Sequence, residues 1–115
     1  MDNNVIVGKS KQFAIRIIRL YQHLSTEKKE FTLSKQVLRS GTSIGANVCE
    51  GVQAQSRNDF ISKMQIALKE ASETEYWLEL LHETDFISEK EYESIAADCS
   101  EVNKILTSIV KTSRK

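Results

Sequence analysis

The stretch Arg39-Ser-Gly-Thr-Ser-Ile-Gly-Ala-Asn-Val-Cys-Glu-Gly51 mixes small, apolar and isolated polar residues as no other segment of the chain does. Within it, Gly41 and Gly45 lie four residues apart, so both fall on the same side of a helix. A glycine inside a helix costs roughly 0.5–1 kcal/mol relative to alanine. The pair therefore indicates that another helix backbone comes close at this point. Gly51 is suited to the left-handed position just past a helix end.

Two stripes run along the helix that this stretch predicts from about residue 33 to Glu50. The apolar stripe contains Leu33, Val37, Ile44 and Val48, at spacings that keep them on one face. The polar stripe beside it contains Gln36, Arg39, Ser43, Asn47 and Glu50. Spacing leaves two interpretations of the polar stripe open: a solvated helix face, or a partly buried network whose members satisfy one another.

Composition predicts a single soluble domain over residues 1–115. Of these residues, 40% are hydrophobic and 28% are charged, and proline is absent, which favours long uninterrupted helices. No window approaches the roughly 20 apolar residues that a membrane helix needs. The first residues show no signal-peptide pattern, so we expect a cytoplasmic protein without a membrane partner.

Cysteine and histidine usage gives no indication of a metal or a cofactor. Cys49 and Cys99 fall beside apolar positions of separate helices, which favours buried free thiols over a disulfide or a reactive site. His23 and His82 stand alone, without neighbours at metal-ligand spacing. With no acid–base pair or cofactor loop either, we expect that the protein is not an enzyme.

Apolar periodicity predicts four helices. The first is expected from about Ser10 to Ser25, after an irregular start, and its apolar arc is wider than one bundle core requires. The surplus is either core packing or a subunit interface. Thr32 is the expected cap of the second helix. The third helix is expected from Ser56 to about His82, and the fourth begins with the capping box Ser88-Glu-Lys-Glu91, before a frayed tail over 111–115.

The short connections between these helices require that neighbours alternate in direction. The expected fold is therefore all-α, an antiparallel up-down-up-down four-helix bundle, although other helical arrangements stay open. On the third helix Ser72 and Glu75 form a stripe beside the apolar one, so both residues are expected to face the second helix.

Several of these residues together resemble a family signature. They are Leu33-Ser-Lys-Gln36, Arg39, Ser43-Ile44, Asn47, Glu50-Gly51, Ile66-Ala67, Ser72 and Glu75. The pattern is similar to that of the four-helix-bundle proteins encoded in intervening sequences of bacterial large-subunit ribosomal RNA genes, the S23 ribosomal protein family. The chain departs from it at Val48-Cys49, where the family more often has isoleucine and alanine.

This resemblance covers nearly the whole chain and implies an up-down bundle that assembles into a homo-oligomeric ring, commonly a pentamer. It also suggests Glu75 as a partner of Arg39, within a structural polar network of Gln36, Arg39, Ser43, Asn47, Glu50, Ser72 and Glu75. A related group of proteins, the accessory variability proteins of retroelements, binds nucleic acid. Most members of the family have no established activity.

Charge is distributed unevenly although the net charge is zero. Residues 1–58 hold nine Lys/Arg and four Asp/Glu, whereas residues 59–115 hold seven and twelve. This is either chance placement or a basic face and an acidic face that meet between subunits of a ring.

Two functions follow. The first is a non-enzymatic, homo-oligomeric scaffold that binds copies of itself. The alternative is a module that binds RNA or a ribonucleoprotein weakly, as an oligomer and without regard to sequence, through cations that contact phosphate. The candidate cations are Lys9, Lys11, Arg16, Arg19, Lys28, Lys29 and Lys35.

Overall fold

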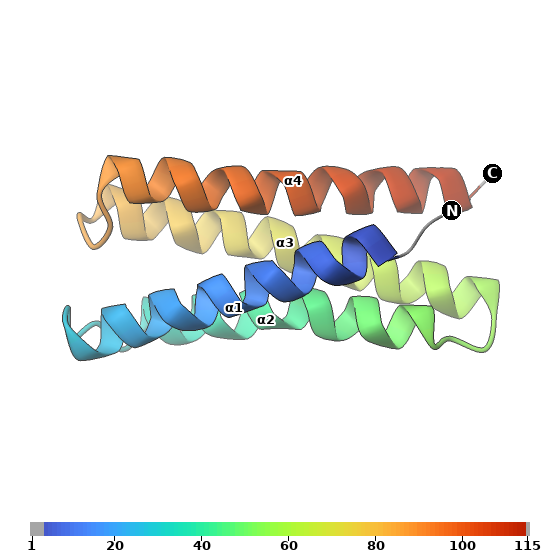
Figure 1. Cartoon of the computed structure of the whole chain (residues 1–115), viewed down its shortest axis with the longest axis horizontal. Helices are drawn as coiled ribbons and strands as arrows, with labels where there is room; N and C mark the ends of the chain where they lie inside the picture. Colours follow the sequence, from blue (N-terminus) through green and yellow to red (C-terminus); the bar gives the residue numbers. More distant parts are fainter. Residues whose placement is uncertain (1–3, 115) are drawn as a thin grey trace.

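A computed structural model describes residues 4–114 and shows four helices in an antiparallel bundle measuring 44 × 20 × 18 Å. The helices are α1 (Asn4–Thr26), α2 (Leu33–Val52), α3 (Arg57–Glu83) and α4 (Glu89–Ser113). Successive helices run in opposite directions, so α1 begins and α4 ends at the same end of the bundle (Figure 1). The predicted all-α up-down-up-down architecture is confirmed.

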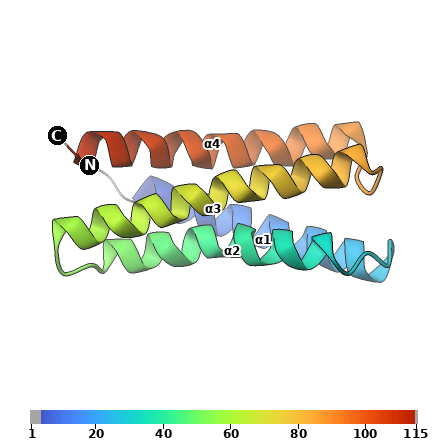
Figure 2. The same cartoon turned by 180° about the vertical axis from the view of Figure 1, so that it is seen from behind.

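The helices follow one another around the bundle in chain order. α2 packs against α1 and α3, and α4 packs against α3 and less closely against α1. The two views agree, because α1 lies in front in Figure 1 and α3 lies in front when the bundle is seen from behind in Figure 2. α1 and α3 are therefore diagonally opposite, and their backbones do not approach each other closely.

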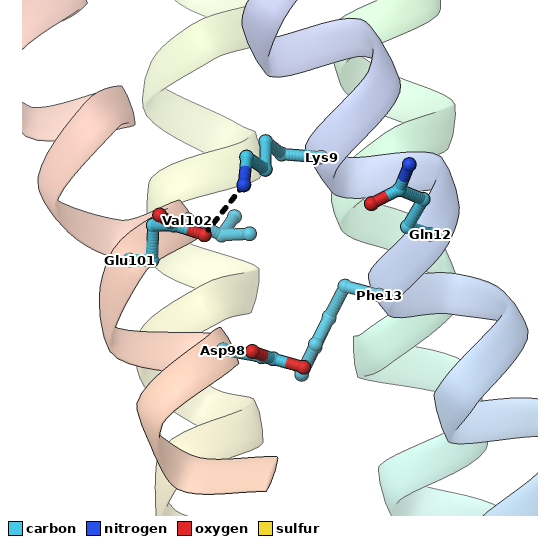
Figure 3. A pocket seen from close by; sticks show the side chains of 6 residues that line it. All are labelled: Lys9, Gln12, Phe13, Asp98, Glu101 and Val102. Atoms are coloured by element: carbon cyan, nitrogen blue, oxygen red, sulfur yellow. Dashed lines mark ion pairs between the residues drawn. The ribbon is translucent and has the colours of Figure 1, made fainter. Parts of the chain in front are cut away.

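The contact between α1 and α4 is less close than the other three, and two ion pairs lie at its outer edge. Lys9 Nζ lies 3.1 Å from Glu101 Oε1, and Arg16 Nη1 lies 2.7 Å from Asp98 Oδ2. Below these pairs Phe13 and other apolar side chains face the core (Figure 3). We call this contact the α1–α4 seam.

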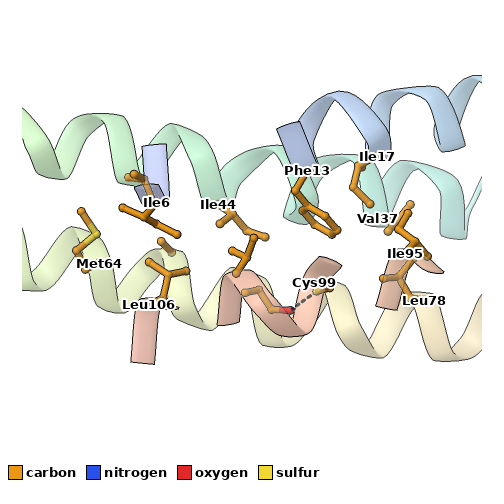
Figure 4. Packing of buried hydrophobic residues seen from close by; sticks show 14 of the residues in the cluster. Ile6, Phe13, Ile17, Val37, Ile44, Met64, Leu78, Ile95, Cys99 and Leu106 are labelled. Atoms are coloured by element: carbon orange, nitrogen blue, oxygen red, sulfur yellow. Dashed lines mark hydrogen bonds between the residues drawn. The ribbon is translucent and has the colours of Figure 1, made fainter. Parts of the chain in front are cut away.

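A continuous apolar core runs the length of the bundle (Figure 4). Every helix contributes one stripe at spacings of three and four, as amphipathic helices do. Fully buried members from successive helices include Ile17, Ile44, Leu78 and Leu106. Full burial of such a side chain stabilises the fold by about 1.5–3 kcal/mol, so these stripes supply most of the stability.

The glycines of α2 lie where helices approach each other, as predicted. A Cβ atom on Gly41 would stand 2.8 Å from the two γ carbons of Ile17 on α1, and one on Gly45 would stand 3.4 Å from the Ser10 carbonyl oxygen. The prediction for Gly51 was wrong, because Gly51 is helical and buried and no described glycine has a positive φ. A Cβ there would meet Met64 Cε at 3.0 Å, so Gly51 permits close contact with α3.

Helix boundaries agree with the sequence at α3 and α4 and differ at α1 and α2. Ser56 and Ser88 cap α3 and α4, and the complete capping box of Ser88 and Glu91 is present. α1 begins at Asn4 instead of Ser10, because Ile6 continues the buried stripe and fills the end of the core. Packing here outweighs the weak local helix propensity.

The cap of α2 is provided by a different residue from the one expected. The side chain of Thr32 makes no capping hydrogen bond. Instead the carboxylate of Glu30 accepts hydrogen bonds from the backbone N–H groups of Leu33, at 3.0 Å, and Ser34, at 2.7 Å. Burial acts to raise the pKa of Glu30, but these hydrogen bonds and one from Thr32 hold it below its usual value.

The C-terminal tail also differs from the expectation. Residues 111–113 continue α4, and the last carbonyl of the helix, that of Ser113, accepts hydrogen bonds from the Arg57 guanidinium at 2.6 and 3.1 Å. A cation at a helix C-terminus is favourable because of the helix dipole. Within residues 4–114, no helix is long and apolar enough to cross a membrane.

Candidate functional site

The polar stripe of α2 lies along the outer edge of its contact with α3. Near the start of the stripe, the Arg39 guanidinium pairs with Glu73, lies 3.4 Å from Glu70 Oε2 and donates to Gln36 Oε1 at 3.2 Å. Trp77 Nε1 donates to the same Glu73 carboxylate at 2.8 Å. The hydrogen bond from Trp77 lowers the pKa of Glu73, burial opposes it, and Arg39 adds to the lowering.

The rest of the stripe makes local contacts. Asn47 donates through Nδ2 to the Ser43 carbonyl oxygen at 2.9 Å, and Glu50 pairs with Lys63 of α3 at 3.0 Å. The side chains of Arg39 and Glu50 are 52% and 60% exposed, so solvent reaches both ends of the stripe. Of the two interpretations, the structure favours a solvated face, and ion pairs at its two ends join it to α3.

Ser72 and Glu75 do not join this stripe, contrary to expectation. Both face α4, where Asn103 Nδ2 lies 3.4 Å from Ser72 Oγ and 3.2 Å from Glu75 Oε1. The expected partnership of Arg39 with Glu75 was therefore wrong, and Glu70 and Glu73 take its place. A shift of two positions along a helix turns a side chain by more than half a turn, which places Glu75 on the other flank of α3.

Sequence reasoning also missed a buried hydroxyl pair between α2 and α3. Thr74 Oγ1 lies 2.8 Å from Ser40 Oγ and 2.8 Å from the Glu70 carbonyl oxygen, and Ser40 and Thr74 are fully buried. Buried hydroxyl groups need such partners, since an unsatisfied one costs about 1–3 kcal/mol. The available signal was the placement of Ser40 and Thr74 within otherwise apolar stripes.

The seven candidate cations do not form one patch. Lys9 and Arg16 are occupied at the α1–α4 seam, where Arg16 also donates to Ser94 Oγ at 2.7 Å. The remaining five are exposed and are spread over α1, the following loop and the start of α2: Lys11, Arg19, Lys28, Lys29 and Lys35. The acidic partners Asp98 and Glu101 show that part of the charge asymmetry is neutralised within one chain.

Two depressions lie along the α1–α4 seam. The smaller, of about 80 Å³, is lined by the residues drawn in Figure 3. The larger, of about 330 Å³, has Leu20, Ile87 and Ile95 as its apolar lining and Arg19 and His23 among its polar residues. Neither brings a nucleophile next to a base, and nowhere in residues 4–114 do His, Cys, Asp or Glu gather as a metal site would require.

The two cysteines differ in environment, and only one matches the prediction. Cys99 is buried, its Sγ lies 3.6 Å from the Ala71 carbonyl oxygen (Figure 4), and burial raises its pKa to about 12. Its thiol therefore stays protonated and unreactive. Cys49 is exposed, contrary to expectation, because it follows Val48 of the buried stripe and points outward.

These features define a class: small helical-bundle proteins with an apolar core, polar edges and shallow surface depressions. Comparison identifies the family within that class. Residues 2–108 match the 23S rRNA-intervening sequence protein family, and the chain belongs to this family.

A solved structure is closely similar to this chain. It is the crystal structure of a protein with unknown function from the S23 ribosomal protein family of Bacteroides thetaiotaomicron VPI-5482. The two sequences are 61% identical, the match covers 96% of this chain and 99% of that one, and the TM-score is 0.94. No curated protein matches the chain. The resemblance inferred from the sequence is confirmed.

Proposed function

We propose that this protein is a non-enzymatic scaffold that acts as a homo-oligomer. The observation that carries the proposal is the outer face of α1, where Ile15 and Ile18 remain 43% and 40% exposed. They lie three residues apart and therefore adjoin on the helix surface. Full burial of an isoleucine is worth about 1.5–3 kcal/mol, and each is already partly covered, so an interface would gain about 1 kcal/mol from each.

The proposed assembly is a closed ring of five copies. The number five rests on the family resemblance. A ring gives every copy the same contacts and leaves no apolar face exposed at an end. A scaffold of this kind needs no catalytic group.

Light scattering coupled to gel filtration tests the proposal directly. A ring of five has five times the 13.1 kDa mass of the chain. Replacing Ile18→Asp should lower that mass, because a carboxylate would have to be desolvated at the interface. Ala97→Asp is the matched control, since Ala97 is exposed on α4 and outside the proposed contact. A native mass of 13.1 kDa at micromolar concentrations would overturn the proposal.

RNA binding is the second candidate. It is supported by the sequence of α1, which carries four cations and no acidic residue, and by the exposed cations of the following loop. Contacts to phosphate alone give weak binding that does not discriminate sequence and falls steeply with salt.

The test is a titration of labelled RNA at two salt concentrations. Lys28→Glu with Lys35→Glu should weaken binding, and Lys104→Glu on α4 is the control, after confirming that all variants keep the native mass. Absence of binding by the native protein at low salt removes this candidate. Equal binding by all variants rejects the loop and α2 as the contact.

A further inference from the structure

In the part of the chain whose side chains the structure describes, the large apolar side chains that remain exposed lie on two diagonal helices and one loop. Among residues 5–114 they are Val5, Ile15 and Ile18 on α1, Phe31 in the loop, and Ile66 and Tyr76 on α3. Because α1 and α3 lie across the bundle from each other, their outer faces point in opposite directions (Figures 1 and 2). Each chain therefore carries two separate apolar faces.

The α1 face is basic, and the α3 face is acidic beyond Tyr76, although Lys69 places one exposed cation a turn after Ile66. Lys11 and Arg19 lie one turn before and one turn after Ile15, both are exposed, and neither forms an ion pair within residues 4–114. α3 has six acidic residues and three basic ones. Of the acidic residues, Glu79 and Glu83 lie one and two turns after Tyr76 and are exposed without an ion pair in the described chain. Opposite charges around apolar centres make the faces complementary.

We propose that the α1 face of one copy docks on the α3 face of the next copy, head to tail. The α1 face is defined by Lys11, Ile15, Ile18 and Arg19, and the α3 face by Ile66, Tyr76, Glu79 and Glu83. The inference rests on the proposed function, since it requires self-assembly, and it specifies which surfaces meet.

A symmetric contact would use these faces poorly. Two α1 faces placed together would oppose cations to cations and would leave Tyr76 and Ile66 in water. A head-to-tail contact buries both apolar centres and places cations beside carboxylates. Since each copy presents the faces on opposite sides, the contact repeats from copy to copy until it closes as a ring or continues as a filament.

The polar stripe of α2 gains a positioning role in this arrangement. Arg39 holds Glu73, and Glu73 accepts the indole hydrogen bond of Trp77. The Trp77 ring in turn packs beside Tyr76, with centroids 5.2 Å apart and planes tilted by 59°. Tyr76 is 53% exposed but is supported on one side before any partner arrives. An aromatic side chain that is ordered in advance loses little entropy on docking.

The test blocks one face at a time and then mixes the variants. Ile15→Glu with Ile18→Glu removes the apolar centre of the α1 face, cancels its positive charge and places two carboxylates opposite Glu79 and Glu83 of α3. Ile66→Arg with Tyr76→Arg removes the apolar centre of the α3 face, cancels the charge of Glu79 and Glu83 and places two guanidinium groups opposite the cations of α1. Each variant alone should have the monomer mass of 13.1 kDa. An equimolar mixture should contain a two-chain species, because one intact face of each kind remains. Ala97→Asp should keep the native mass.

Compensating charges provide a second measurement that does not depend on mixing. Lys11→Glu with Arg19→Glu should lower the native mass, and so should Glu79→Lys with Glu83→Lys. The fourfold variant should regain the native mass, since every contact then has its charges exchanged. Circular dichroism confirms that each variant is folded; all four positions are exposed.

The outcomes separate this inference from the proposed function. A native protein that is monomeric overturns both. A native oligomer whose mass is unchanged by the α3 substitutions overturns only the head-to-tail contact, because α3 is then outside the interface. Failure of the mixture to associate, or of the fourfold variant to recover, also overturns the head-to-tail contact.

Discussion

Replacing Gly41→Ala should destabilise the bundle although alanine is the better helix former. The added Cβ would stand 2.8 Å from both γ carbons of Ile17 and 3.2 Å from its Cβ. These atoms are attached at the base of a fully buried side chain, which cannot swing away. α1 and α2 must therefore move apart, and that movement weakens the packing along both helices.

The magnitude follows from two opposing terms. Alanine favours the helix by about 0.5–1 kcal/mol, and overpacking a core costs about 1–3 kcal/mol. The expected net destabilisation is about 0.5–2 kcal/mol. For a domain of 115 residues, unfolding entropies of about 2.1 cal/mol/K per residue convert this to a fall in Tm of about 2–8 °C.

Two other glycines serve as matched controls. A Cβ on Gly8 has nothing within 4 Å, so Gly8→Ala should raise stability by about 0.5–1 kcal/mol. A Cβ on Gly45 would make an ordinary contact at 3.4 Å, so Gly45→Ala should change little or stabilise slightly.

Thermal unfolding followed by circular dichroism measures the series, with all proteins at one concentration because assembly shifts Tm. A Tm for Gly41→Ala as high as that for Gly8→Ala would show that the helices do not approach as described.

Three further predictions concern the cap of α2, the thiols and the polar stripe. Glu30→Gln should lower stability by about 1 kcal/mol at neutral pH. The folded pKa of Glu30 lies below the ordinary value of 4.5, so this difference should persist above pH 4.5 and disappear as the pH falls through the folded pKa. Denaturation of both proteins at neutral pH and at a pH below the folded pKa would reveal the change. A thiol reagent should label Cys49 in the native protein and Cys99 only after unfolding; rapid labelling of both under native conditions would contradict the burial of Cys99. Arg39→Gln should reduce stability by less than about 1 kcal/mol, since its ion pairs are half exposed, and a loss above about 3 kcal/mol would indicate a buried network.

Periodicity predicted the fold because every helix has an apolar stripe that only a bundle can bury. The caps at Ser56 and Ser88 were predictable, since each depends on residues three positions apart in sequence. The cap of α2 was not predictable, because Glu30 lies in the loop before the helix and accepts hydrogen bonds from the first backbone N–H groups of α2. The start of α1 was missed for another reason: Ile6 is helical through its place in the core, and local sequence does not reveal that packing.

The candidate site was harder to predict than the fold. The α2 side of the polar stripe could be read from its spacing, because residues three or four apart share a face. The partners of this stripe on α3 could not be predicted. Whether Glu73 or Glu75 faces Arg39 depends on the rotation of α3 about its own axis. The ion pairs of Lys9 and Arg16 with α4 could not be predicted either, because the sequence does not show that the first and last helices pack against each other.

The α1–α4 seam has a consequence for how the bundle opens. Three of the four helix contacts in the bundle join helices that are linked by a short loop, so the entropy cost of closing that loop is small. The fourth joins the first helix to the last, and solvent-exposed ion pairs that salt can screen line its edge. Local opening should therefore begin at this seam: α1 and α4 would separate from each other while α2 and α3 remain packed together. Depressions of about 80 and 330 Å³ already mark this line on the closed molecule.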